Sequence, residues 1–333
     1  MDNIPGFWFS PTYDCNNRCA WCYAGRLLSS RYHAPLDQAQ TYVRQLKQAG
    51  ARSCILVGGE PTKYPHLLEL VSFMSRIGLE VKIMSNGRAL ADSNFVTDLK
   101  KAGLHYCAVS IEGTEAIHDA ITQVPGSFAE SWQGLENLKS AGIRCNTITT
   151  VSSYNINIID ELVEFFQGRV PMATFNMCSA QPSGFHKDEH AGQITLAQYA
   201  RVVERIGTAY DFTRFYALLP LCLYDQALLP GLLESGRLRV SCSLHGNAVA
   251  VDPWGNLSPC THMPDLQYGQ LDDPGALPRF LSARIDETRF LKTHAPSQHC
   301  VNCRLWTTCL GGCNLIWFAR NAQENIPGLA PQT

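Results

Sequence analysis

Short apolar stretches alternate with helical patterns through roughly the first 210 residues of the chain, and this alternation limits the fold more than any other feature. Glycines at positions 50, 78, 103 and 142 each separate a helical pattern from the next strand, where a left-handed residue closes a helix. Such units predict an α/β fold with a parallel sheet, and six of them predict a partial (β/α)6 TIM-like barrel. The expected strands are residues Phe7–Tyr13, Cys54–Val57, Val81–Met84, Tyr106–Ile111, Ile143–Val151 and Ala173–Met177.

The pattern changes near Asp211, where strand–helix units stop and proline, glycine and cysteine become frequent. We therefore expect a barrel core over residues 1–210, a linker over 211–235 and a small cysteine-rich domain over 236–333.

Charge and hydropathy narrow the range of partners and compartments. Lys+Arg 27 against Asp+Glu 29 leaves a net charge of −2 with no basic run, which disfavours nucleic acid as a partner. The N-terminal sequence has no signal-peptide pattern, and no apolar run is long enough to span a membrane. We expect a cytoplasmic protein without a membrane partner.

Fourteen cysteines in such a protein indicate metal rather than disulfides, and most of them are clustered. Cys15, Cys19 and Cys22 follow the first predicted strand. Three thiolates at this spacing can bind three irons of a [4Fe–4S] cluster and leave the fourth iron open. A zinc site would need a fourth nearby ligand, and three unrelated core cysteines are the other alternative.

The cysteine triad and the following Tyr23 resemble the CxxxCxxC motif of the radical S-adenosylmethionine (SAM) superfamily. Gly58-Gly59-Glu60 resembles the GGE motif, which in that superfamily binds the methionyl amino group. The resemblance implies a cluster that reductively cleaves S-adenosylmethionine to a 5′-deoxyadenosyl radical, which abstracts a hydrogen atom from the substrate. It also implies that polar residues at the strand ends contact the cofactor, with Ser85, Asn86, Ser110, Glu112 and Asn155 as candidates.

The second group of cysteines resembles the SPASM domain, a C-terminal extension that holds auxiliary [4Fe–4S] clusters. By this resemblance an inner cluster would use Cys242, Cys260 and Cys313, with Cys222 either a further ligand or a core residue. An outer cluster would use Cys300, Cys303 and Cys309 and would lack a fourth cysteine. That iron would then be open or oxygen-ligated, or the cluster smaller; a zinc ribbon is the alternative for the whole set.

The resemblance also bears on the reaction. Auxiliary clusters would transfer electrons or bind substrate, and Cys178, at the end of the sixth strand, would donate a hydrogen atom or simply pack in the core. We expect modification of a side chain or α-carbon of a ribosomally made peptide or protein. The alternatives are dehydrogenation, decarboxylation or rearrangement of a small molecule, and a non-catalytic iron–sulfur electron carrier.

Two protein partners are expected as well. A flavodoxin or ferredoxin would supply electrons. The first strand begins by Phe7, so no peptide-recognition domain is expected ahead of the barrel, which weakens the peptide hypothesis unless a separate protein recognises the peptide.

Overall fold

The computed structural model describes residues 4–177, 192–216, 219–240, 248–293, 300 and 302–313. Within these residues, ten strands form one sheet in the order β10-β9-β1-β2-β3-β4-β5-β6-β7-β8. All neighbouring pairs from β9 to β8 are parallel, and only β10 runs antiparallel to its neighbour. The strands are β1 Gly6–Phe9, β2 Ser53–Leu56, β3 Glu80–Ser85, β4 Leu104–Ser110, β5 Arg144–Val151, β6 Ala173–Met177, β7 Thr213–Tyr216, β8 Leu238–Arg239, β9 Val249–Val251 and β10 Leu257–Ser258.

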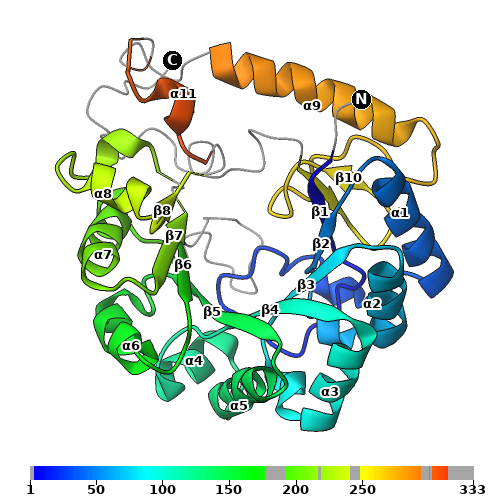
Figure 1. The fold of residues 1–333 in the computed structure, drawn as a ribbon, viewed down its shortest axis with the longest axis horizontal. Coiled ribbons are helices and arrows are strands. Elements are labelled where there is room, and N and C mark those ends of the chain that lie inside the picture. The colour runs from blue at the N-terminus through cyan, green and yellow to red at the C-terminus, as the bar shows by residue number, and fades with distance from the viewer. Residues whose placement is uncertain are drawn as a thin grey trace.

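Helices cover the outer face of this curved sheet (Figure 1), as the glycine-punctuated alternation predicts. The α-helices are α1 Leu36–Gln48, α2 Leu67–Arg76, α3 Ser93–Ala102, α4 Glu115–Thr122, α5 Ser127–Ser140, α6 Ile159–Phe166, α7 Leu196–Ala209, α8 Leu229–Glu234, α9 Ala276–Thr293 and α11 Trp306–Cys309. Short 3-10 turns are η1 Leu28–Ser30, η2 Pro61–Lys63, η3 Arg88–Ala91, η4 Ile156–Ile158 and η5 Leu221–Leu223.

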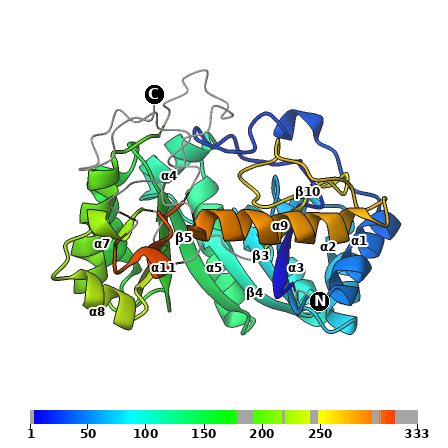
Figure 2. The same cartoon turned by 90° about the horizontal axis from the view of Figure 1, so that it is seen from above.

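The sheet does not close, since β8 and β10 are its two edge strands. α9 extends across this open side, from the neighbourhood of β10 to that of α11 (Figures 1 and 2). The fold is thus an α/β fold with an open, mostly parallel barrel-like sheet. Among the described residues, no helix combines the length and apolar character of a membrane span.

The six predicted strands are confirmed as β1 to β6, with differences at their ends. β1 stops at Phe9 rather than Tyr13, because Pro11 has no N–H to continue a ladder. The four predicted glycines are left-handed, with φ of 101°, 77°, 99° and 68° at Gly50, Gly78, Gly103 and Gly142.

The expectation that strand–helix units stop near Asp211 is wrong. β7, α8 and β8 continue the parallel order, and β9 joins the far side of the sheet beside β1. The sequence pattern missed β8 to β10 because they are only two or three residues long. The division into residues 1–210, 211–235 and 236–333 stays a prediction.

Candidate active site

The loop that carries the cysteine triad, residues 15–22, begins shortly after β1 at the C-terminal edge of the sheet. Gly58 and Gly59, at the end of β2, run against the chain that leads into this loop, and the Gly59 N–H donates to the Thr12 carbonyl at 3.0 Å. A Cβ on Gly58 would lie 2.4 Å from the Thr12 oxygen, and one on Gly59 would lie 2.3 Å from the Asp14 oxygen. Both positions therefore require glycine, because any Cβ there would overlap a backbone oxygen of the neighbouring segment.

The carboxylate of Glu60 is buried and held by residues of its own turn and of β3. Its Oε1 accepts hydrogen bonds from the Thr62 N–H at 3.0 Å and from the hydroxyls of Thr62 and Ser85, both at 2.8 Å. Its Oε2 accepts from the Asn86 N–H at 2.7 Å. Glu60, Ser85 and Asn86, three of the predicted cofactor contacts, thus form one network at the ends of β2 and β3.

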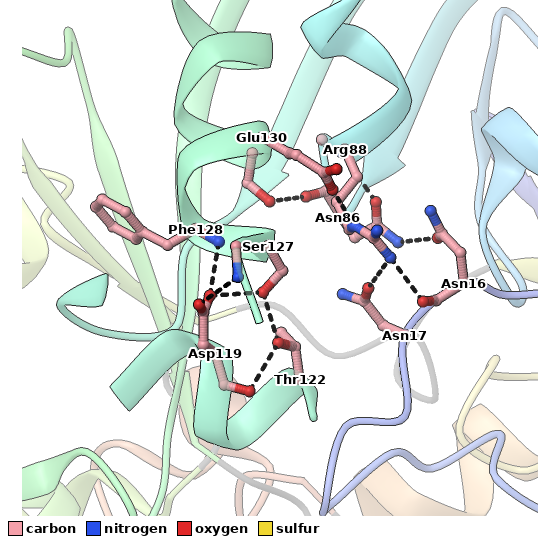
Figure 3. A network of polar contacts seen from close by, with 12 residues as sticks. Asn16, Asn17, Asn86, Arg88, Asp119, Thr122, Ser127, Phe128 and Glu130 are labelled. Carbon is pink, nitrogen blue, oxygen red and sulfur yellow. Dashed lines mark hydrogen bonds and ion pairs between the residues drawn. The ribbon is translucent and has the colours of Figure 1, made fainter. Parts of the chain in front are cut away.

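Arg88, which follows β3, fixes the backbone of the cysteine loop (Figure 3). Its Nη1 donates to the Asn16 carbonyl at 2.7 Å and to Asn17 Oδ1 at 3.2 Å, while its Nε pairs with Glu130 on α5. Asn86 adds a side-chain bond from its Nδ2 to Asn16 Oδ1 at 2.7 Å. The segment between the first two cysteines is therefore held from β3 and α5.

The end of α4 holds the same loop from a second direction. The N–H groups of Arg18 and Ala20 donate to the carbonyls of Thr122 and Ile121, at 2.9 and 3.1 Å. These carbonyls belong to the last turn of α4, whose oxygens have no partner inside the helix.

Asp119 of α4 in turn caps α5, as the close view shows (Figure 3). Its Oδ2 accepts from the Gly126 N–H at 2.6 Å, and its Oδ1 accepts from the Phe128 N–H at 2.8 Å and the Ser127 hydroxyl at 2.9 Å. Burial opposes ionisation, but the Phe128 and Gly126 N–H bonds prevail and lower the pKa of Asp119. The cap therefore links the helix that holds the cysteine loop to the helix that carries Glu130.

The three thiols lie in a protected environment. Burial raises the pKa of Cys15 to about 12, that of Cys22 to about 11 and that of Cys19 well above its ordinary value. Such thiols stay protonated unless a metal binds and displaces the protons. Within the same loop, the indole Nε1 of Trp21 is buried without a hydrogen-bond partner among the described residues.

Across the described part of the chain, no three His, Cys, Asp or Glu side chains converge on a single metal ion. A tetrahedral zinc with Zn–S bonds of about 2.3 Å would need its sulfur ligands about 3.8 Å apart. An iron–sulfur cubane binds each cysteine through a different iron, so its ligands lie further apart. The three thiols at residues 15–22 are enough to bind three irons of such a cluster, one iron each.

Glu112 and Asn155 join the ends of β4 and β5 beside the triad. Burial raises the pKa of Glu112 to about 8 although its Oε2 accepts from the Thr150 N–H at 2.8 Å, and its charge acts on Cys19. The Asn155 amide donates to the carbonyls of Glu112 and Thr150, at 2.8 and 2.9 Å, and accepts from the Ser152 N–H at 2.8 Å. Asn155 thus acts within the protein as a tie between the two strand ends.

His118 is a further buried residue of this region. Its Nδ1 accepts from the Glu112 N–H at 3.1 Å, while its Nε2 has no partner among the described residues. Burial lowers the pKa of His118 to about 4, so the ring is neutral at pH 7.

Tyr23 connects the triad to the second group of cysteines. Its ring lies 4.2 Å from that of His262, measured between centroids, and its hydroxyl hydrogen bonds to Thr261. The Nδ1 of His262 lies 3.8 Å from Cys260 Sγ, and the charge of Cys313 acts on the same ring. His262 was missed, although its Cys-x-His spacing from Cys260 is a visible signal.

Cys222 lies on η5 as an exposed residue whose sulfur is partly covered. Burial of its sulfur raises the pKa of Cys222, and the thiols of Cys309, Cys300 and Cys303 raise it further. Cys222 is therefore close to the three cysteines assigned by resemblance to the outer cluster. Ser110 ends β4, half-buried, whereas Cys178 and Cys242 lie outside the described residues.

Comparison with known proteins agrees with this geometry. Residues 9–166 match the model of the radical SAM superfamily. An AdoMet-dependent heme synthase of Oleidesulfovibrio alaskensis is 28% identical over 94% of this chain and 83% of its own length. Mycofactocin maturase MftC of Mycobacterium ulcerans is 26% identical over 92% of this chain and 82% of its own length.

Among solved structures, Streptococcus suis SuiB bound to precursor peptide SuiA has a similar fold. It matches with a TM-score of 0.71 and 16% identity, over 100% of this chain and 76% of SuiB. Three further relatives are matched over only 44% to 54% of their own length. Residues 9–166 thus form a radical SAM domain, and the chain is an enzyme.

Proposed function

We propose that this enzyme modifies a side chain or α-carbon of a ribosomally made peptide or protein. The observation that carries the proposal is the cysteine loop, held by Arg88, Asn86 and the end of α4 beside the Glu60 network. The peptide class is supported by MftC, named as a maturase, and by SuiB, solved with a precursor peptide.

In this proposal Cys15, Cys19 and Cys22 hold a [4Fe–4S] cluster. The cluster, when bound, supplies the electron for cleavage of S-adenosylmethionine at its open iron. The protein's own part is to hold the loop rigid and to present polar groups at the strand ends. Gly58, Gly59, Glu60, Tyr23 and Ser110 are the proposed surroundings of the cofactor.

Cys260, Cys313 and Cys242 are proposed to hold an auxiliary cluster in a SPASM-like C-terminal region. A flavodoxin or ferredoxin is the proposed electron donor, and a separate protein is proposed to present the peptide. Cys178 is kept as a proposed hydrogen-atom donor.

A second substrate class is favoured by one observation, the heme synthase aligned over 94% of this chain. A radical SAM enzyme of this length could instead oxidise or decarboxylate a small molecule of the porphyrin type. The two classes differ in the substrate from which hydrogen is abstracted.

The first test is anaerobic. The reconstituted protein is mixed with S-adenosylmethionine and dithionite, and 5′-deoxyadenosine is measured together with bound iron and sulfide. We expect Cys15→Ala, Cys19→Ala and Cys22→Ala each to abolish 5′-deoxyadenosine, whereas Cys145→Ala, at a buried cysteine of β5, retains it. Iron without cofactor cleavage in the wild type would reject the proposal.

The second test separates the substrate classes. Deuterated candidate peptides and a deuterated iron porphyrin are supplied in turn, and 5′-deoxyadenosine is analysed for deuterium by mass spectrometry. Transfer of deuterium from a peptide to 5′-deoxyadenosine supports a peptide substrate. Transfer from the porphyrin rejects the peptide proposal in favour of a small-molecule substrate.

A further inference from the structure

The 3-10 turn η5, residues Leu221–Leu223, lies against the C-terminal cysteine segment although 88 residues separate them in sequence. The N–H of Leu221 donates to Cys309 Sγ at 3.2 Å, and both residues are buried. Cys222 is the next residue in the chain, so this hydrogen bond fixes its backbone beside Cys309.

The other cysteines of the segment are held close by their own turns. The Cys303 N–H donates to the Cys300 carbonyl at 3.1 Å, and the Cys309 N–H donates to the Leu305 carbonyl at 2.7 Å. The Trp306 N–H donates to the Cys303 carbonyl at 3.0 Å, so Cys300, Cys303 and Cys309 lie on consecutive turns of one segment. The bond from Leu221 to Cys309 Sγ places the turn that carries Cys222 beside this segment.

A buried hydroxyl provides a second, independent indication of a ligand. Tyr224, two residues after Cys222, is 2% exposed, and its hydroxyl has no hydrogen-bond partner among the described residues. Besides burial, the charge of Glu204 acts most strongly on this hydroxyl, and the charge of Cys309 acts on it next. A buried O–H without an acceptor is costly, whereas thiolate or sulfide sulfur at this place would accept its hydrogen bond.

Four cysteines can hold either one zinc ion or an iron–sulfur cluster. The iron–sulfur function proposed for this chain favours the cluster. Four cysteine thiolates, one for each iron, are the ordinary ligand set of a [4Fe–4S] cluster.

We propose that Cys222, Cys300, Cys303 and Cys309 are the four ligands of one auxiliary [4Fe–4S] cluster, an inference that rests on the proposed iron–sulfur function. Cys222 then supplies the fourth ligand that the resemblance left missing from the outer set. A cluster with four cysteine ligands has no open iron. Its role is therefore electron transfer and not ligation of the substrate.

The first experiment measures metal and cluster type in the reconstituted protein, with Cys222→Ala compared to the wild type. Leu223→Ala, in the same turn, is the control for local disturbance. We expect Cys222→Ala to lose about four irons per chain, or about one iron with appearance of the electron paramagnetic resonance signal of a [3Fe–4S] cluster. Leu223→Ala should keep the wild-type iron content and spectrum.

The second experiment needs no variant. Iodoacetamide is applied anaerobically to the iron-free and the reconstituted protein, and modification is located by mass spectrometry. We expect the exposed Cys222 to be alkylated without iron and protected with it, while the fully buried Cys54 is unmodified in both states.

Several outcomes would overturn the proposal. They are an unchanged iron content and spectrum in Cys222→Ala, equal alkylation of Cys222 in both states, and zinc in place of iron in the purified protein. Formation of 5′-deoxyadenosine by the wild type is measured in the same preparations. Its absence would reject the proposed function, whereas the iron count and the alkylation pattern decide the ligand set by themselves.

Discussion

The buried His118 makes the stability of the protein depend on pH in a range that is easily measured. Burial lowers the pKa of the ring to about 4, while Asp119 raises it and Arg88 lowers it. In the unfolded chain the pKa returns to about 6.5. The pKa of His118 is lower in the folded protein than in the unfolded chain. The contribution of His118 to the free energy of unfolding is therefore complete above pH 6.5 and is lost as the pH falls towards 4. Between pH 7.0 and 5.5 the linkage relation gives a loss of about 1 kcal/mol.

His118→Asn tests this value, because the asparagine oxygen can still accept from the Glu112 N–H but the side chain does not titrate. Urea unfolding of wild type and variant, followed by tryptophan fluorescence at pH 7.0 and 5.5, gives the change in unfolding free energy. We expect the pH-dependent loss to be smaller in His118→Asn by about 1 kcal/mol. His66→Asn, at an exposed histidine, is the control and should follow the wild type. An equal loss in His118→Asn and wild type would refute the reasoning.

Further predictions concern residues that hold the cysteine loop or the helices beside it, together with a control glycine in α8. In Gly134→Ala the new Cβ would lie 2.3 Å from the Gly87 carbonyl oxygen, so we expect a loss of about 1–3 kcal/mol in unfolding free energy. Gly231→Ala in α8 meets no atom within 4 Å and should stabilise the protein by about 0.5–1 kcal/mol; a loss as large as that of Gly134→Ala would contradict this. Asp119→Asn should cost about 1–2 kcal/mol in urea unfolding, because an amide cannot accept from both N–H groups that the carboxylate caps. Arg88→Gln should lower the iron retained after desalting, with the fold unchanged by circular dichroism; full retention would show that the loop does not depend on this residue.

Much of the barrel could be predicted because its signals are local. Strands β2 to β6 lie within a few residues of the expected ranges, and the glycines that end the helices have positive φ. Cys54, Cys107 and Cys145, which lie on these strands, are buried in the core. Each of these features depends on a short window of sequence.

Contacts between distant segments could not be predicted in this way. The pairing of Arg88 with Asn16, and of Cys309 with the turn at Leu221, joins residues 72 and 88 positions apart. For Asn155 the sequence predicted the position at a strand end but not the contacts of the side chain. Its amide is hydrogen bonded within the protein, to Ser152, Glu112 and Thr150. A polar residue at a strand end can therefore be placed near the site from the sequence. Its hydrogen-bond partners cannot be predicted in this way, because some of them come from segments that are distant in the chain.

The pairing of β9 with β1 has a consequence for synthesis of the chain. About 240 residues separate the two strands, and at about 5–20 residues per second they take roughly 10–50 s to translate. During that time β1, with Phe7 and Phe9 among its four residues, has one edge without its final partner. An unpaired apolar edge is a site for association between chains. Folding of this enzyme during translation therefore depends on protection of its first strand until about three quarters of the chain has been made.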